Sequence, residues 1–523
     1  MNEKIPVIDL FAGPGGLGEG FASFQNSKKI SPFKIKLSIE KDYYAHQTLQ
    51  LRSFFRQFEK DRIPFEYYEY LRGCLRRDEL FKKYPRQAEK AQSETWLAEL
   101  GRNPEEEIDK RVHPAIDKSE AWLLIGGPPC QAYSFVGRSR IRGEDKKKHT
   151  NNYEKDHRHY LYREYLRILA VHQPPVFVME NVKGILSSEV KGENIFKHML
   201  LDLKFPVETV KSSKLIKNRI IRNCKYRIFS LVKPVEDPSS LTDSDFIIRS
   251  EDYRIPQSRH RVILLGIRSD LQVIPKVLRK GTKRILSDAI SDMPKIRSRF
   301  SKEPDSADEW CNTLNSLISE SWFKRQPEEL QQVISEFIRR LDVGLPVGSE
   351  FIQGKYSKGR IGFEKEWFFD SKLRGYCNHV SRGHIREDLK RYFFAECFAI
   401  VNGRSPRITD FPESLYPKHR NIYTSSPAEI IFDDRFRVQL PDAPSTTVVS
   451  HISKDGHYFI HPDPLQCRSL TVREAARLQT FPDSYLFEGP RTEQYKQVGN
   501  AVPPLLARQI AGCVYRLFES IDH

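Results

Sequence analysis

Short runs of apolar residues recur along the first half of the chain, and each ends at a turn or a polar residue. The runs cover residues 5–10, 35–39, 122–125, 175–182 and 261–267. Runs of this length, bounded by glycine, proline or polar residues, are typical of strands. Charged and amphipathic stretches lie between them, and residues 160–172 have the spacing of an amphipathic helix. Strands that alternate with helices predict an α/β fold with a doubly wound, mostly parallel sheet.

The remaining segments lack this alternation. Residues 52–112 are charged and aromatic with a mostly helical pattern, which predicts a helical insertion. Residues 270–440 hold many Arg, Asp, Ser and Pro without strong alternation, which predicts a second, smaller and irregular domain. Helices are expected to start within 470–482 and to cover 500–517, the latter with Pro503 and Pro504 in its first turn. We therefore divide the chain into residues 1–270, 271–467 and a segment 468–523 that returns to the first domain.

The charge balance points to an anionic partner. The 523 residues include 85 Lys and Arg against 69 Asp and Glu, a formal net charge of +16. An excess of this size favours nucleic acid as the partner. The composition excludes a collagen-like or wholly disordered chain, and the length is sufficient for several domains.

The eight cysteines contain no CxxC pair, which indicates free thiols in a reducing compartment. Asn378, His379 and His384 lack a cysteine or carboxylate at metal-ligand spacing, so no metal is expected. No apolar run approaches the ~20 residues of a membrane span. The N-terminus lacks the layout of a signal peptide. These features predict a cytoplasmic protein without a membrane association.

A glycine-rich turn, DLFAGPGGLGEG at 9–20, follows the first apolar run. Glycines allow a ligand to approach the backbone at a helix N-terminus, and an acidic residue after the next strand often holds ribose hydroxyls. Glu40 has that position. The turn alone leaves three interpretations open: a nicotinamide cofactor, S-adenosylmethionine, or a plain strand–turn–helix.

Two further side chains follow buried strands. Cys130, in GGPPCQAYS, comes after two prolines that fix the direction of the thiol at the carboxyl edge of the sheet. Glu180, in FVMENV, ends the run 175–182 at the same edge, where partial desolvation would suit a proton donor. The alternatives are a buried structural cysteine and a salt-bridged carboxylate.

In QSRHRV, Gln257, Arg259 and Arg261 alternate into a strand and therefore share one face. Arginines on one face suit anion contacts and can stabilise a thiolate, whereas the alternative is an exposed basic edge strand. Asn500, in QVGNAVPP, either closes a cofactor pocket or caps a helix.

Together these segments resemble the DNA (cytosine-5) methyltransferase family of bacterial type. The resemblance lies in FAGPGG, GGPPCQAYS, ENV, QSRHR, REAARLQTFPD and QVGNAVPP, which occur in the order that the family uses and cover roughly a third of the chain. It implies a Rossmann-like S-adenosylmethionine-dependent domain, with residues 285–445 in the position of a target-recognition domain.

The resemblance also implies the chemistry. Cys130 attacks carbon-6 of a cytosine flipped out of duplex DNA, Glu180 assists at ring nitrogen 3, and carbon-5 receives the methyl group. Arg261 matches the active-site arginine, with Arg259 and Gln257 in support. The cofactor residues that it implies are Phe11, Gly13, Gly15, Gly16, Leu17, Glu40, Pro129, Asn500 and Val502. The DNA-contacting residues that it implies are Gln131, Ser134, Arg138, Arg140, Thr446 and Thr447. The basic segment 137–160, which holds Arg138 and Arg140, is expected to close over DNA and contact phosphates.

The chain departs from the family pattern at two places. Arg254 stands where the family usually has glycine, in Tyr253–Arg254–Ile255–Pro256–Gln257. The element that usually supplies an acidic residue near the adenine is not recognisable within 52–112.

Four functions are compatible with some or all of these segments. A DNA cytosine-5 methyltransferase of a restriction–modification or defence system accounts for all the segments. An RNA methyltransferase of the tRNA-modifying branch has a shorter recognition region and a Cys-Phe-Thr signature that is absent here. An inactive DNA-binding relative fits poorly with intact Cys130, Glu180 and Arg261, and a nicotinamide oxidoreductase explains only the glycine turn. We expect a monomer that acts on DNA, and a restriction endonuclease as a functional partner without a stable complex.

Overall fold

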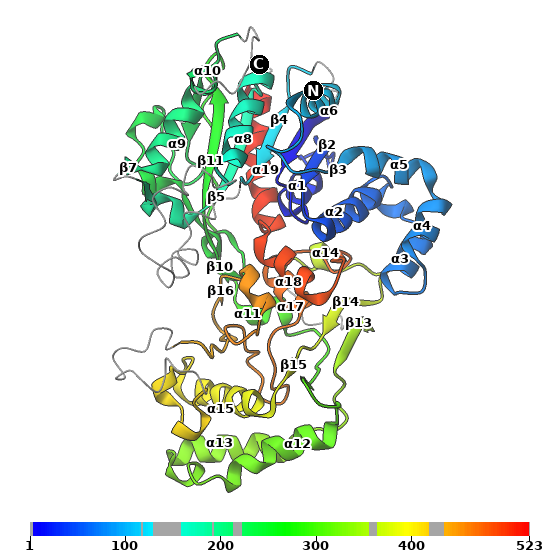
Figure 1. Cartoon of the computed structure of the whole chain (residues 1–523), viewed down its shortest axis with the longest axis vertical. Coiled ribbons are helices and arrows are strands. Elements are labelled where there is room, and N and C mark those ends of the chain that lie inside the picture. Colours follow the sequence, from blue (N-terminus) through cyan, green and yellow to red (C-terminus); the bar gives the residue numbers. More distant parts are fainter. Residues whose placement is uncertain are drawn as a thin grey trace.

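The computed structural model describes residues 4–116, 119–128, 158–190, 193–212, 222–354, 363–417 and 434–521. Its upper body is built around one eight-stranded sheet with the order β3-β2-β1-β4-β5-β11-β8, and β9 pairs with β11 (Figure 1). The strands are β1 (Ile5–Leu10), β2 (Phe33–Glu40), β3 (Thr95–Leu97), β4 (Leu123–Gly126), β5 (Val176–Val182), β8 (Tyr226–Phe229), β9 (Ile247–Arg249) and β11 (His260–Arg268). The strands from β3 to β5 pair in parallel, and β11 is antiparallel to its neighbours. The α/β fold class is confirmed.

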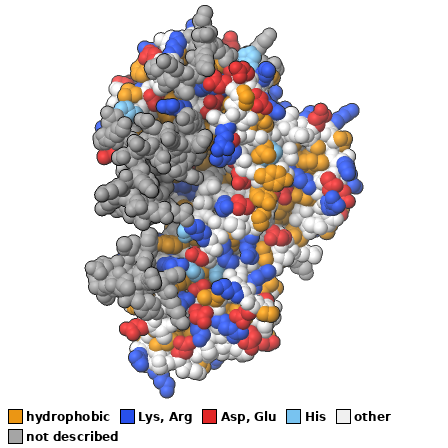
Figure 2. All heavy atoms as spheres, in the orientation of Figure 1, with side chains coloured by type: hydrophobic (Ala, Val, Ile, Leu, Met, Phe, Trp, Pro, Cys, Tyr) orange, Lys and Arg blue, Asp and Glu red, His pale blue; other side chains and the backbone are white. Residues whose placement is uncertain are grey.

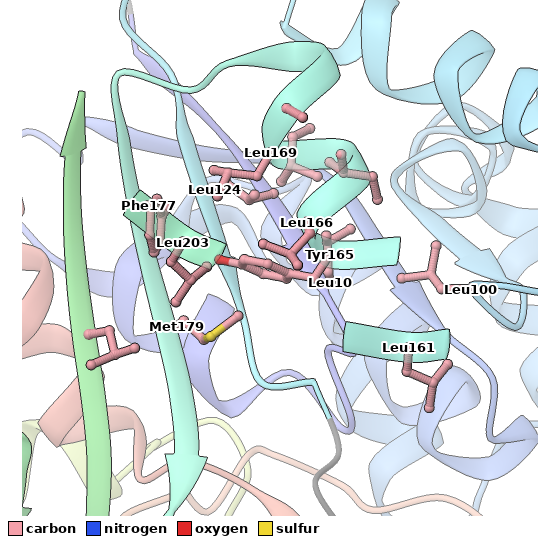
Figure 3. Packing of buried hydrophobic residues seen from close by; sticks show 14 of the residues in the cluster. Leu10, Leu100, Leu124, Leu161, Tyr165, Leu166, Leu169, Phe177, Met179 and Leu203 are labelled. Carbon is pink, nitrogen blue, oxygen red and sulfur yellow. The ribbon is translucent and has the colours of Figure 1, made fainter. Parts of the chain in front are cut away.

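The apolar runs predict five of these strands to within a few residues. Alternate residues of each strand point to opposite faces, and both faces are buried. On one face, Leu10, Leu124, Phe177 and Met179 pack against helix α8 (Arg158–His172), as Figure 3 shows. The residues adjacent to these in each strand, such as Val178, point to the other face and contribute to a second core there. β11 is central and buried, so it is not the exposed basic edge strand that was considered as an alternative.

The second face of the sheet is covered by α1 (Gly16–Ser23) and α19 (Pro504–Ile521), which pack together. The chain end therefore joins the core of the first body. The helix predicted over 500–517 is present, but its predicted start is wrong. Asn500 ends α18 (Arg491–Asn500), and Pro504 begins α19. Pro504 occupies the first position of α19, where its missing N–H has no partner to lose.

The segment 52–112 is mostly helical, as predicted, but it also contains β3. Its helices and the others of the upper body are α2 (Tyr43–Arg56), α3 (Phe65–Leu71), α4 (Arg77–Lys83), α5 (Pro85–Glu94), α6 (Glu105–Ile116), α9 (Ile195–Lys204) and α10 (Pro206–Ser212). Aromatic residues of α2 and α3, such as Phe54 and Tyr67, form a separate core that includes Leu373 and Cys377. The insertion thus connects the sheet to the region that follows.

The lower body contains regular helices where the sequence predicts an irregular domain (Figure 1). α12 (Ala307–Asn315), α13 (Glu328–Arg339) and α15 (Arg386–Asn402) share an apolar core. The middle of α15 is a nearly continuous buried stretch, so the helix lacks the separate apolar and polar faces that reveal a surface helix in a sequence. Shorter helices are α11 (Leu286–Ile290), α14 (Lys365–Phe368) and α17 (Val472–Leu478). α17 starts within the predicted range 470–482.

Small two-stranded sheets lie outside the large sheet. They pair β6 (Glu189–Val190) with β7 (Glu193–Asn194), β10 (Gln257–Ser258) with β16 (Ser445–Thr446), β12 (Arg299–Phe300) with β15 (Gly383–His384), and β13 (Gly348–Gln353) with β14 (Gly375–Val380). Of the helices in the described ranges, none is long and apolar enough to cross a membrane. The same ranges contain no group of three His, Cys, Asp or Glu side chains placed to hold a metal ion.

Candidate active site

An ion pair joins two of the predicted catalytic residues. Arg261 Nε lies 2.8 Å from Glu180 Oε1, and the side chains are 13% and 14% exposed. β5 and β11 run antiparallel with Ile263 opposite Glu180, so Arg261 is the diagonal neighbour of Glu180 on the same face. Burial lowers the pKa of Arg261, and the Glu180 carboxylate opposes that effect. The sheet therefore presents an acid and a guanidinium side by side at the carboxyl end of β5.

The chain leaves β4 beside this pair. A Cβ on Gly127 would lie 2.9 Å from Glu180 Oε2, so the absence of a side chain lets the carboxylate approach the loop. The described chain stops at Pro128, shortly before the predicted nucleophile. Cys130 lies outside the described residues, as do Pro129, Gln131, Ser134, Arg138 and Arg140.

Gln257 and Arg259 are fully buried and make a different set of contacts. Arg259 donates to the carbonyl of Val448 at 2.7 Å and to that of Gly499 at 3.2 Å. Gln257 accepts from the Val448 N–H at 2.8 Å and donates to the Leu478 carbonyl at 3.2 Å. Burial and the nearby charge of Arg261 lower the pKa of Arg259. These two side chains join segments that are distant in sequence, whereas Arg261 pairs with Glu180.

Thr446 and Thr447 lie next to β10, the short strand that contains Gln257. β16 pairs with β10, and the Thr447 hydroxyl donates to the Ser258 carbonyl at 2.6 Å. The Thr446 N–H donates to Gln439 Oε1 at 2.9 Å. The run predicted to contact DNA is thus attached to the strand that leads to Arg261.

The glycine-rich turn adopts left-handed backbone conformations that favour glycine. Gly13 has φ +57° and Gly15 has φ +94°, while Phe11 has φ +56° despite its side chain. A Cβ on Gly16 would lie 2.3 Å from the carbonyl oxygen of Val502. The turn therefore contacts the segment after α18 so closely that only glycine fits. Leu17 is buried below it, and Asn500 is exposed at the end of α18.

Glu40 closes this turn from the neighbouring strand. One carboxylate oxygen accepts the Gly13 N–H at 2.7 Å, and the other accepts the N–H groups of Lys41 and Asp42 at 2.8 Å each. Burial raises the pKa of Glu40, and these three hydrogen bonds oppose the rise. The predicted ribose-binding acid is therefore held in a fixed orientation by backbone donors.

A hollow of about 420 Å³ lies beside Glu40. Its lining residues are Lys41, Asp42, Leu97, Ala98, Glu99 and Asn103. Leu97 is the register partner of Glu40, so the hollow follows the carboxyl ends of β2 and β3. The sequence analysis missed these residues because β3 is three residues long and has no recognisable pattern. A glycine turn, a fixed carboxylate and a hollow with apolar and acidic walls fit an adenosyl cofactor.

Arg254, at the usual glycine position, also has a left-handed backbone, with φ +65°. It follows a short 3-10 helix, Ser250–Tyr253, as the residue that ends it. Glycine is favoured in this conformation because it lacks a Cβ. The left-handed backbone thus explains why the family prefers glycine at this position. Arg254 adopts the same turn, and its side chain pairs with Glu364 at 3.5 Å.

Comparisons with known proteins agree with this geometry. Residues 83–206 and 245–516 match the family model of the C-5 cytosine-specific DNA methylases. The type II methyltransferase M.Bpa9945I of Bacillus paralicheniformis is 33% identical to this chain, over 97% of this chain and 98% of its own length. M.DdeI, a type II methyltransferase of Desulfomicrobium norvegicum, is 26% identical over 99% of this chain and 90% of its own. A crystal structure of a putative DNA modification methyltransferase from an E. coli prophage has a TM-score of 0.50 at 19% identity, covering 99% of this chain and 100% of its own, and shares the fold. The chain belongs to the C-5 cytosine-specific DNA methylase family.

Proposed function

We propose that the chain methylates carbon-5 of cytosine in a specific duplex DNA sequence, with S-adenosylmethionine as the methyl donor. The observation that carries this proposal is the Glu180–Arg261 ion pair at the carboxyl end of β5. The end of β4 lies beside this pair, and the chain continues from there toward Cys130. Membership of the cytosine-5 methylase family fits that arrangement. The DNA substrate also suits the net charge of +16.

The proposed cofactor residues would surround the bound methyl donor. Phe11, Gly13, Gly15, Gly16 and Leu17 would hold the methionine part, with Pro129, Asn500 and Val502 closing over it. Glu40 would accept the ribose hydroxyls, and the hollow past Leu97 would take the adenine. When bound, S-adenosylmethionine supplies an electrophilic methyl group, and its demethylated product is S-adenosylhomocysteine.

The protein side chains would activate the base. The Cys130 thiolate bonds to carbon-6, and the ring electrons move to make carbon-5 a nucleophile. Glu180 holds a proton at ring nitrogen 3. Arg261 keeps Glu180 in place and also donates a hydrogen bond to the base. After methylation, loss of the carbon-5 proton expels the Cys130 sulfur and restores the aromatic ring.

Access to carbon-6 requires the cytosine to leave the helical stack. The segment with Gln131, Ser134, Arg138 and Arg140 would close over the flipped base and contact phosphates. Thr446 and Thr447 would approach the DNA from the recognition side. In this proposal residues 1–270 and 468–523 form the catalytic domain, and 271–467 select the sequence.

Gln257 and Arg259 would act as positioning residues. Their buried hydrogen bonds hold Val448 and Gly499 near the strand that carries Arg261. Neither has to touch the cytosine to affect its placement. In a restriction–modification system the protein would work in the cytoplasm of a prokaryote, at its nucleoid, as a monomer beside a separate endonuclease.

Bisulfite sequencing tests the proposal. DNA from a methylation-free host that expresses the wild-type chain should show methylated cytosine in one fixed sequence context. A Cys130→Ala variant should leave the same DNA unmethylated, because no thiolate is present to activate carbon-6. Unmethylated DNA from a host that contains folded wild-type protein would contradict the proposal.

A further inference from the structure

Three arginines from separate segments meet at the junction of the two bodies. Arg299 lies in β12, Arg382 follows β14, and Arg491 is the first residue of α18. Arg491 Nη1 donates to the carbonyl of Ser381 at 2.8 Å, and Arg299 is the register partner of Gly383. Arg299 and Arg491 are thus joined to the two residues that flank Arg382.

The cluster has donor groups without acceptors. Arg382 is 7% exposed, donates one hydrogen bond to the Ile452 carbonyl at 2.7 Å, and lies over the Tyr495 ring. Its Nη1 is buried and has no hydrogen-bond partner within the described part of the chain. Arg299 Nε and the Ser381 hydroxyl are also buried and have no hydrogen-bond partner among the described residues. A buried guanidinium nitrogen without an acceptor is unfavourable, so an acceptor from a bound anion would stabilise these donors.

Neighbouring arginines contrast with this cluster. Arg297 pairs with Asp305 at 2.8 Å, and Arg391 pairs with Asp388 at 2.7 Å. Among the described residues, no carboxylate lies within ion-pair distance of Arg299, Arg382 or Arg491. Burial lowers the pKa of Arg491, and the charges of Arg382 and Arg299 add to the effect, whereas Glu350 opposes it. Carboxylates act on this cluster without forming ion pairs among the described residues, Asp305 near Arg299 and Glu350 near Arg491. A group of arginines that lacks such pairs suits an anionic ligand.

We propose that Arg299, Arg382 and Arg491, with the Ser381 hydroxyl, bind a phosphate of the DNA backbone. Guanidinium and hydroxyl donors match the oxygens of a phosphodiester. Ile452, to which Arg382 donates, lies in the helical turn Ser450–Ser453 just after Thr446 and Thr447. Figure 2 shows Lys and Arg side chains on the viewed face at the waist between the bodies. The inference rests on the proposed function and adds a contact that fixes the position of the recognition region on the duplex.

Salt-dependent DNA binding by the full chain tests the site. Arg299→Gln removes one charge from a side chain that makes no ion pair with any described residue, so folding should be retained, as circular dichroism can verify. We expect its Kd for a 30-base-pair duplex to rise about fivefold to tenfold at low salt, and the slope of log K against log salt to fall by about 0.9. Arg299→Lys should keep the wild-type slope, because the charge remains.

Arg340→Gln is the matched control. It removes the same charge from the residue that follows α13, where Arg340 pairs with Glu336 at 2.9 Å. Its slope should equal the wild-type slope. A second variant, Arg491→Gln, should repeat the loss seen for Arg299→Gln.

The outcomes separate this inference from the proposed function. Wild-type protein that binds DNA while Arg299→Gln binds equally well, with an unchanged slope, would overturn the inference alone. Wild-type protein that fails to bind DNA would overturn both. If millimolar inorganic phosphate raises the melting temperature of the wild type but not of Arg299→Gln, while the DNA slopes are equal, the site binds free phosphate and the DNA assignment is wrong.

Discussion

At the scale of single residues, the proposed chemistry depends on a carboxylate that has one charged partner. Glu180→Gln keeps the shape of the side chain but removes the charge that faces Arg261. The amide cannot hold a transferable proton at the cytosine ring, so we expect the rate of methyl transfer to fall by about 100-fold or more. The buried Arg261 also loses its counter-charge, which should lower the free energy of unfolding by about 1–3 kcal/mol. Methyl-transfer kinetics and thermal denaturation measure the two effects.

Glu364→Gln provides the control for this prediction. Glu364 is partly buried and pairs with Arg508 at 3.1 Å and with Arg254 at 3.5 Å, whereas Glu180 pairs with Arg261. Its substitution should reduce stability slightly and leave the rate of methyl transfer unchanged. A Glu180→Gln enzyme with the wild-type rate would show that this carboxyl group takes no part in the reaction.

The candidate site residues that the sequence identifies lie at the ends of strongly apolar strands. Glu40, Glu180 and Arg261 each follow or begin an apolar run, and the sheet brings them to one edge. The lining of the hollow could not be found because Thr95–Leu97 is too short to show a pattern. The burial of Arg259 could not be found either, since its acceptors lie 189 and 240 residues away in sequence. Contacts of this range depend on the fold and leave no local signal.

At the scale of secondary-structure elements, the glycine turn is held by the close packing of α1 on α19. A Cβ on Gly20 would lie 2.3 Å from the Ala507 Cβ and 2.6 Å from the Arg508 backbone nitrogen. Gly20→Ala would force the two helices apart, and we expect the free energy of unfolding to fall by about 1–3 kcal/mol. Chemical denaturation monitored by circular dichroism measures this change.

Gly512→Ala is a matched substitution in the partner helix. A Cβ at Gly512 would meet the Phe24 ring at 3.1 Å, and the next atoms lie 3.8 Å away. Since the ring can move slightly and alanine favours a helix by about 1 kcal/mol over glycine, stability should stay level or rise. Equal losses in the two variants would indicate that the helix contact is looser than it is in the structure.

The elements themselves were predictable to different degrees. Strands 5–10, 122–125, 175–182 and 261–267 are buried on both faces, so their sequences read as continuous apolar runs. The helices of the lower body carry no clear signal in the sequence, since α15 is buried over most of its surface and has apolar and charged residues without a clear stripe. Aromatic packing among Tyr392, Phe394 and Phe411 holds that region together instead.

At the scale of the whole molecule, Arg259 links the two sides of the proposed cleft. Its guanidinium holds the Val448 carbonyl, next to the proposed DNA-contacting Thr447, and the Gly499 carbonyl, next to the proposed cofactor residue Asn500. Arg259→Lys retains the positive charge but replaces a rigid fork with a single ammonium group, which cannot hold both carbonyls in the same geometry. We expect the KM for DNA and the KM for S-adenosylmethionine to rise together by about fivefold or more, with a smaller effect on kcat than that of Glu180→Gln. Steady-state kinetics with each substrate varied in turn measure both constants. A rise in one KM alone would show that the two segments move independently, and that Arg259 positions only the side whose constant has changed.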